Sequence, residues 1–330
     1  RAQLATLNAA LMGLFEGAGA MRVEPAALHP AGALLDVYGE DLRARAFTLE
    51  DEAGAELVLR PDFTVPVVQL HLAAHEAPAR YSYLGPVWRR QPPGSARPTE
   101  YLQAGIEVFG EDAAEADAAV FALMREALAL GGVETPAIVT GDLGLIVAML
   151  NAAPMPDHRR AALKRHFWRP ARFQALLRRY AAPAQAPSAA RAALLADPSG
   201  LDAAMRAAGE FVGKRGRAEI AARLDLLRAD AGAAPIPAAC ADAIEAAFAV
   251  EGPATDAHAR LADLARGAGL DITPALDRFA RRLDALAARG ENPDALPFRA
   301  ATARALEYYD GFVFEMAAPG RRDLPPLAGG

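Results

Sequence analysis

The sequence predicts an α+β fold, in which helices flank an antiparallel sheet and an all-helical insertion separates two sheet-forming parts of the chain. Three observations lead to this prediction. Residues 33–60 and 80–109 alternate apolar and polar side chains between turn signals, which is the pattern of strands. From about 150 to 290, alanine, leucine and arginine recur at helical spacing. A strand pattern then returns at 301–316.

Two domains follow from this change of pattern. We expect a sheet-containing core from residues 1–145 together with 295–330, and a helical insertion at 146–294. The arginines of the insertion are expected on solvated helix faces, with a nucleic-acid surface as the alternative.

The first elements can be placed from spacing and capping residues. Residues 1–20 are predicted to be helical, and residues 33–60 predict two strands joined by a turn at Asp51–Gly54. A helix is expected to begin near Thr64, because threonine caps helices well and proline is tolerated in a first turn. The leucines that recur at helical spacing in the first segment are Leu4, Leu7, Leu11 and Leu14.

A hairpin and a helix complete the predicted first half. Residues 80–89 and 99–109 predict two strands around a loop rich in proline, glycine and arginine. Residues 113–130 predict a strong helix that two glycines, 131 and 132, close. The end of the chain, 320–330, has the composition of a loop.

The overall composition argues against several classes of protein. A chain of 330 residues that is 53% hydrophobic can bury a sizeable core. A net charge of −6 and a pI near 5.6 argue against a general nucleic-acid binder. The single cysteine, Cys240, rules out a disulfide framework; we expect a small buried side chain and a reducing cytoplasm. No apolar run long enough for a membrane span and no signal-peptide pattern occur.

The common nucleotide and metal signatures are missing from the sequence. It contains no phosphate loop, no G-x-G-x-x-G and no H-E-x-x-H. His71 and His75 lie four residues apart on the predicted helix and could share a metal, but no third ligand is evident. We therefore expect neither a metal nor another cofactor.

Three stretches remain as candidates for binding chemistry, and the first is LRPDFT at 59–64. A turn that leaves a strand places Asp62 and Thr64 at the edge of the sheet, where both could accept hydrogen bonds from an ammonium group. The alternative is a helix cap, which Thr64 could provide at the same time.

The second stretch is the later strand of the hairpin. Alternate residues of a strand share one face, so Tyr101, Gln103, Gly105 and Glu107 line up together. The glycine is expected to leave room for something to approach the sheet, and a buried carboxylate needs a cationic or hydrogen-bonding partner. A solvent-facing polar stripe is an equally good interpretation of the spacing.

The third stretch is RALEYYDGFVFE at 304–315. Arg304 offers a planar fork for a carboxylate or a phosphate. Tyr308 and Tyr309 point to opposite faces of an extended chain, so one of them can line a given pocket. Core packing would also explain both tyrosines.

Together these stretches resemble the catalytic core of class II histidyl-tRNA synthetases. That family carries L-R-P-E-G-T, then F-R-x-E-R-P-Q-x-G-R-x-R-x-F-x-Q-x-G-x-E, then R-G-L-D-Y-Y before a strand that ends in V-F-E. The corresponding segments here are LRPDFT, WRRQPPGSARPTEYLQAGIE and RALEYYDGFVFE, in the same order. The resemblance covers roughly residues 1–145 and 295–330, and it implies a class II aminoacyl-tRNA synthetase-like antiparallel sheet.

The departures from the synthetase pattern concern ATP. Gln91 stands where the family has glutamate, and Pro92 and Thr99 stand where it has arginines, although Arg97 is kept. Each lost arginine removes a charge-assisted phosphate contact. The chain also ends in LAGG, which we expect to begin the family's glycine-rich strand, and no anticodon-binding domain is recognised.

The amino-acid half of the synthetase site looks intact. By resemblance, Glu107 and Tyr309 would hold the imidazole of histidine; Asp62, Thr64 and Gln103 would take its ammonium; and Arg304 would lie on the carboxylate side. The full set that the resemblance assigns to histidine is Asp62, Thr64, Arg89, Gln103, Glu107, Arg304, Tyr308 and Tyr309.

The degenerate hairpin, with LLDVYGED and LRPDFTVPV, is similar to the regulatory subunits of ATP phosphoribosyltransferase. That resemblance implies a non-catalytic, histidine-binding protein. It would form a homodimer through the core, join a short-form catalytic subunit in a hetero-octamer, and regulate the first step of histidine biosynthesis without tRNA. Inhibition would be transmitted from this pocket or from a subunit interface. The alternatives are a working or truncated histidyl-tRNA synthetase, an orphan histidine-binding paralogue, and a tRNA-binding or sensor module.

Overall fold

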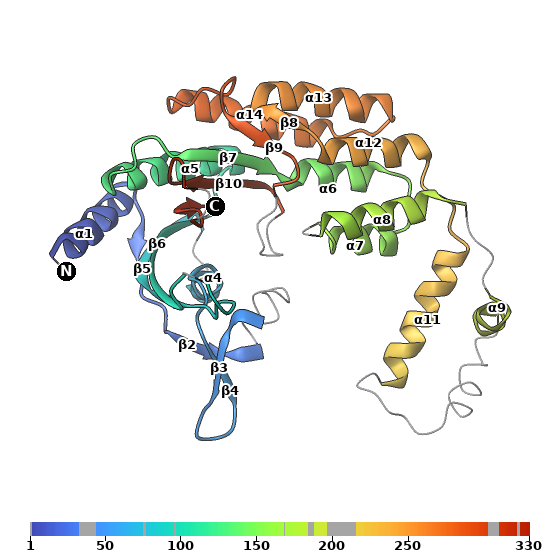
Figure 1. Cartoon of the computed structure of the whole chain (residues 1–330), viewed down its shortest axis with the longest axis horizontal. Coiled ribbons are helices and arrows are strands. Elements are labelled where there is room, and N and C mark those ends of the chain that lie inside the picture. Colours follow the sequence, from blue (N-terminus) through green and yellow to red (C-terminus); the bar gives the residue numbers. More distant parts are fainter. Residues whose placement is uncertain are drawn as a thin grey trace. The chain divides into compact units, whose positions relative to one another are not determined.

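The computed structural model describes residues 2–32, 44–74, 77–95, 97–167, 169–183, 188–196, 216–302, 310–321 and 324–330. Figure 1 shows its helices and strands along the chain. The chain separates into two units, which are described one at a time. The first comprises Arg1–Ile146, Phe248–Asp263 and Ile272–Gly330, and the second Val147–Ala247 and Leu264–Asp271. The domain limits expected from the sequence, a core of residues 1–145 with 295–330 and an insertion at 146–294, remain a prediction.

A small three-stranded sheet lies near the start of the first unit, and it confirms the predicted strand–turn–strand segment. Its order is β2-β4-β3, with antiparallel neighbours. The Asp51 carboxylate closes the turn, because its Oδ1 accepts from the N–H groups of Ala53 and Ala55 at 2.9 and 2.8 Å. The strands are β2 (Leu28–Pro30), β3 (Phe47–Glu50) and β4 (Glu56–Leu59).

The predicted hairpin is the longest strand pair in the described part of the chain. Strands β5 (Ala79–Trp88) and β6 (Glu100–Phe109) pair antiparallel over ten residues each. On its other edge, β5 pairs in parallel with the two-residue strand β1 (Met21–Arg22). The first helix, α1 (Ala2–Gly17), is present as predicted, but Met12 and Phe15 are its buried side chains, and Leu4 is half exposed.

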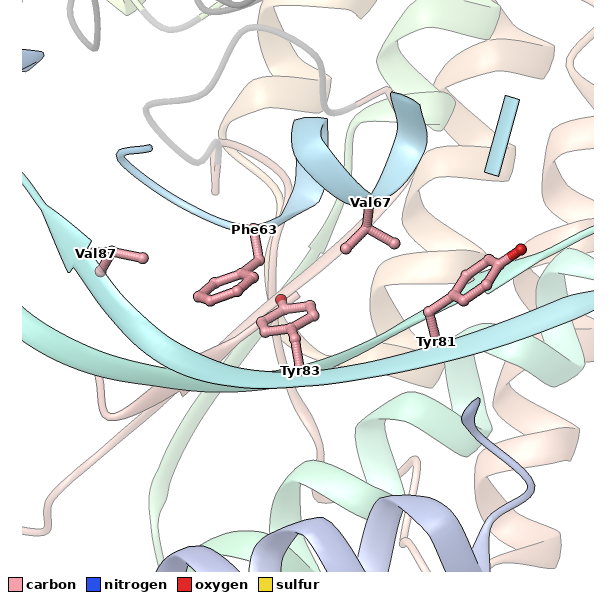
Figure 2. Packing of buried hydrophobic residues seen from close by; sticks show 5 residues of the cluster. All are labelled: Phe63, Val67, Tyr81, Tyr83 and Val87. Carbon is pink, nitrogen blue, oxygen red and sulfur yellow. The ribbon is translucent and has the colours of Figure 1, made fainter. Parts of the chain in front are cut away.

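Helix α4 (Thr64–Ala74), predicted from Thr64, covers one face of this hairpin. In Figure 2, Phe63 and Val67 point from the start of α4 towards Tyr81, Tyr83 and Val87 of β5. All five side chains are at most 4% exposed. At roughly 25 cal/mol per Å² of buried apolar surface, the three aromatic rings supply most of the packing energy of this cluster. The cluster therefore fixes the start of α4 against the sheet.

A second sheet carries the C-terminal part of the first unit. Its order is β11-β10-β7-β9-β8, and β7 pairs antiparallel with β10 over six residues. The return to strand after 301 is confirmed for the described residues, and the segment expected to be a loop contains β11. The short strand β8 lies inside the range predicted as helical, and the sequence did not indicate β7. The strands are β7 (Ala137–Asp142), β8 (Glu251–Pro253), β9 (Pro297–Arg299), β10 (Phe312–Ala317) and β11 (Ala328–Gly329).

Helices α5 (Ala113–Leu130) and α14 (Thr273–Ala288) pack together, and ion pairs link α5 to the C-terminal part of α14 and the residues after it. Arg282, with a side chain 2% exposed, binds Asp117 of α5 at 2.7 Å and Asp142 of β7 at 2.5 Å. Arg125 of α5 pairs with Glu291 just beyond α14. The predicted helix 113–130 is confirmed, with Asp112 as its N-cap.

The second unit is helical in its described residues. Arg159 of α7 is buried and binds the Asp230 carboxylate of α11 at 2.6 Å, which joins these two helices. Cys240 is buried, as expected. No helix in the described ranges is both long and apolar enough to span a bilayer. The other helices in the described residues are α6 (Leu143–Ala152), α7 (Asp157–Lys164), α8 (Pro170–Ala181), α9 (Ala189–Ala196), α11 (Arg217–Ala231), α12 (Ala238–Phe248) and α13 (Ala254–Gly267).

Candidate functional site

Asp62 and Thr64 meet at the N-terminus of α4. The Thr64 N–H donates to Asp62 Oδ1 at 3.1 Å, so Asp62 satisfies one of the free N–H groups that begin every helix. The Asp62 residue is only 2% exposed. The Thr64 hydroxyl is not the cap: it donates to Glu107 Oε1 across the sheet at 2.8 Å. The sequence suggested a helix cap for Thr64, whereas in the structure Asp62 accepts the hydrogen bond from the N–H group at the start of the helix.

The polar stripe on β6 does not face solvent. The register pairs Gln103 with Gly85, Gly105 with Tyr83, and Glu107 with Tyr81, so these residues share the face that α4 covers. The predicted alignment of Tyr101, Gln103, Gly105 and Glu107 on one face is confirmed by this register. The polar side chains of Gln103 and Glu107 are therefore partly buried on this face, and Thr64 at the start of α4 contacts Glu107.

Gly105 leaves room for a side chain of the protein and not for a ligand. A Cβ atom on Gly105 would lie 2.6 Å from Tyr83 Cζ, well inside van der Waals contact. The Tyr83 ring lies over this glycine and stacks on Phe63, with centroids 4.4 Å apart and planes 6° apart (Figure 2). The room that the sequence predicted beside this glycine is occupied by the Tyr83 side chain of the neighbouring strand. Strand alternation places Tyr83 on the same face as Tyr81, but it does not indicate that the Tyr83 ring lies over Gly105.

The Glu107 carboxylate connects Thr64 and Tyr83. Its Oε1 accepts from Thr64 Oγ1 at 2.8 Å and from the Tyr83 hydroxyl at 3.2 Å. Burial raises the pKa of Glu107 from 4.5 to about 7; the Thr64 and Tyr83 hydrogen bonds lower it, and the Asp62 carboxylate adds to the rise. Near neutral pH this carboxyl group is therefore close to half ionised, and a cation placed beside it would favour the charged form.

Gln103 adds a second acceptor on the same face. Its Oε1 atom is buried and has no hydrogen-bond partner among the described residues. An unsatisfied buried carbonyl costs free energy, so an N–H donor at this point would stabilise the protein. Together, Asp62, Thr64, Gln103 and Glu107 present oxygen atoms that suit a ligand with several N–H donors.

The arginines next to this group bind backbone. Arg89 Nε donates to the carbonyl of Pro61 at 2.7 Å, which holds the hairpin against the LRPDFT turn. Arg60 Nε donates to the carbonyl of Pro86 at 3.0 Å, and its guanidinium carbon lies 4.0 Å from the Phe63 ring centroid. Both residues fix the turn that carries Asp62 and Thr64.

The side chain of Gln91 closes the hairpin loop. Gln91 Nε2 donates to the carbonyls of Arg89 and Pro98 at 3.4 and 3.3 Å, and the Arg89 N–H donates to the Thr99 carbonyl at 2.8 Å. The Gln91 side chain is therefore turned into its own loop, while Arg97 is exposed.

The remaining candidates are the predicted residues of the 304–315 stretch and the histidine pair. Arg304, Tyr308 and Tyr309 lie outside the described residues, as does His75. The His71 ring lies 3.3 Å from the Tyr81 hydroxyl through Nδ1 and stacks on Phe109 at 4.1 Å, so it packs beside the sheet. In the described ranges, no three histidine, cysteine or carboxylate residues form a possible metal site.

The family model for histidyl-tRNA synthetase matches residues 1–235. An ATP phosphoribosyltransferase regulatory subunit from Mesorhizobium japonicum is 37% identical to the chain; the match covers 96% of this chain and 87% of that protein. The protein of the same name from Allorhizobium ampelinum is 36% identical, with 97% and 88% covered. The chain belongs to the family of ATP phosphoribosyltransferase regulatory subunits. This membership supports the role of a regulatory subunit of that enzyme.

Solved structures confirm the fold of this regulatory-subunit family. The crystal structure of an ATP phosphoribosyltransferase regulatory subunit/histidyl-tRNA synthetase from Bacillus halodurans matches with a TM-score of 0.66 at 19% identity. The match covers 98% of this chain and 70% of that one. The predicted α+β, class II synthetase-like fold is thus confirmed.

Proposed function

We propose that this chain is a non-catalytic regulatory subunit that binds histidine beneath α4 and activates a short-form ATP phosphoribosyltransferase catalytic subunit. The two would assemble as a hetero-octamer and control the first step of histidine biosynthesis. The observation that carries the proposal is the connected group of Asp62, Thr64 and Glu107, in a chain whose relatives are named as regulatory subunits of this enzyme.

The chemistry of this group fits an amino acid with a basic side chain. The Asp62 carboxylate lies close enough to Glu107 to raise its pKa, and a bound cation would reduce the repulsion between the two carboxylates. The Thr64 hydroxyl donates a hydrogen bond to Glu107, so the lone pairs of the Thr64 oxygen remain as acceptors for an ammonium group. The buried Gln103 carbonyl offers a further acceptor. The assignment of Arg304, Tyr308 and Tyr309 to the same ligand rests on the family resemblance.

The residues of the hairpin loop support the proposal that the chain lacks synthetase activity. Gln91 is engaged with its own loop, and Pro92 and Thr99 stand where the synthetases have arginines that would bind phosphate. Without those charge-assisted contacts, ATP would lose its strongest anchors. We therefore propose that the chain acts through its partner and neither activates histidine nor charges tRNA.

Reconstitution tests this proposal. The chain is mixed with a short-form catalytic subunit from the same source, and phosphoribosyl-ATP formation is followed with and without histidine. We expect turnover that requires this chain and falls when histidine is added. Turnover that is unchanged by the chain would overturn the proposal.

The second candidate function, a histidyl-tRNA synthetase, is favoured by the family model over residues 1–235. It requires histidine-dependent exchange of pyrophosphate into ATP. Exchange at a rate above the background without enzyme would establish this activity and remove the non-catalytic assignment.

A further inference from the structure

Tyr83 is the side chain that joins the hydrophobic cluster to the polar group beneath α4. Its ring is 4% exposed, stacks on Phe63 and lies over Gly105. Its hydroxyl reaches Glu107 Oε1 at 3.2 Å. The ring is therefore confined on two sides, and its hydroxyl has a fixed position next to the carboxylate.

The two hydroxyls that meet Glu107 come from different elements. Thr64 Oγ1 approaches from the start of α4 and the Tyr83 hydroxyl from β5, and both donate to Oε1. In the described residues nothing donates to Oε2. Because both donors approach the same oxygen, the second oxygen remains for an incoming N–H group.

We propose that Tyr83 is a positioning residue of the ligand pocket: its hydroxyl holds the Glu107 carboxylate in the orientation that accepts an N–H donor of the bound amino acid. This assignment rests on the proposed histidine site and deepens it. No contact between Tyr83 and the ligand is required, because Tyr83 acts through Glu107.

The charges around Glu107 determine what the loss of this hydroxyl does. Asp62 lies at the turn before α4, Tyr83 and Tyr81 lie on β5, and His71 of α4 reaches the Tyr81 hydroxyl. Of these, Asp62 raises the pKa of Glu107, and the Tyr83 hydrogen bond lowers it. Removing the hydroxyl therefore raises the pKa of Glu107, so that ionisation and ligand binding move to higher pH.

The test compares Tyr83→Phe with Tyr81→Phe. Both changes remove one hydroxyl from the same strand face, but the Tyr81 hydroxyl is near His71 and not Glu107. Histidine affinity is measured by calorimetry from pH 6 to pH 9 on the full chain. Tyr83→Phe is expected to bind histidine about ten-fold more weakly at neutral pH, the usual effect of losing a hydrogen bond to a charged group. Its affinity should recover at higher pH, whereas Tyr81→Phe should follow the wild-type profile.

A second measurement does not depend on the ligand. The titration of the Glu107 carboxyl carbon is followed by NMR in the wild type and in Tyr83→Phe, with Glu107→Gln used to assign the signal. A higher midpoint in Tyr83→Phe supports the assignment, and an unchanged midpoint or an unchanged histidine affinity overturns it. If the wild type binds no histidine, the proposed function fails, and the midpoint alone decides whether Tyr83 positions Glu107.

Discussion

Substitution of Gly105 by alanine is expected to destabilise the first unit strongly. The new Cβ would lie 2.6 Å from Tyr83 Cζ, and carbon atoms in contact prefer about 3.5–4.0 Å. The Tyr83 ring would have to move by about 1 Å. It cannot do so without disturbing its stack on Phe63 or its hydrogen bond to Glu107.

The size of the effect can be estimated from these contacts. Overpacking a dense core costs about 1–3 kcal/mol, and a weakened aromatic pair about 0.5–1.5 kcal/mol. Partial loss of the Tyr83–Glu107 hydrogen bond adds about 1 kcal/mol. We therefore expect the free energy of unfolding to fall by about 3 kcal/mol.

Guanidinium unfolding, followed by circular dichroism, measures this change. Gly13→Ala is the matched control, because nothing lies within 4 Å of the position of its Cβ and it lies inside α1. Alanine in a helix is more stable than glycine by about 0.5–1 kcal/mol, so the control should shift in the opposite direction. A Gly105→Ala protein as stable as the wild type would refute the account of Tyr83 packing over this glycine.

Two further predictions concern buried charge. Arg282→Met removes the partner of two carboxylates, Asp117 and Asp142, and should lower the free energy of unfolding by about 3–5 kcal/mol. The control is Arg281→Met at the neighbouring exposed position, which should change the free energy of unfolding by at most about 0.5 kcal/mol in the same denaturation assay. Equal effects of the two changes would contradict the buried network. Because the pKa of Glu107 rises from 4.5 to about 7 on folding, the folded state holds a proton that the unfolded state releases between these pH values. The contribution of Glu107 to stability is therefore full below about pH 4.5 and falls as pH rises to about 7, by on the order of 3 kcal/mol. Denaturation of the wild type and Glu107→Gln at pH 5 and pH 8 measures this difference, and a constant difference would exclude the raised pKa.

The sequence predicted those elements whose pattern is local. The helix from Thr64, the helix 113–130 and the hairpin strands were found because capping, periodicity and turn residues act within a few residues of one another. The alignment of Gln103 and Glu107 on one face followed from the two-residue period of a strand.

Features set by distant contacts could not be predicted in the same way. Strand β7 is held by β10, more than 150 residues later, and a Cβ on its Gly141 would lie 2.9 Å from the carbonyl oxygen of Arg299. The short strand β8 exists through its pairing with β9. The role of Tyr83 depends on which ring lies over Gly105, and strand alternation gives the face of a side chain but not its neighbour across the strands.

Histidine binding by the isolated chain tests the central claim most directly. Calorimetric titration is carried out on the wild type, on Glu107→Gln and on Glu100→Gln, which changes the same residue type on the same strand but on its other face. The account predicts saturable binding by the wild type and by Glu100→Gln, and binding at least about ten-fold weaker by Glu107→Gln, which cannot carry the negative charge. Equal affinity in all three proteins would place histidine elsewhere, and no binding by the wild type would contradict the proposed sensor.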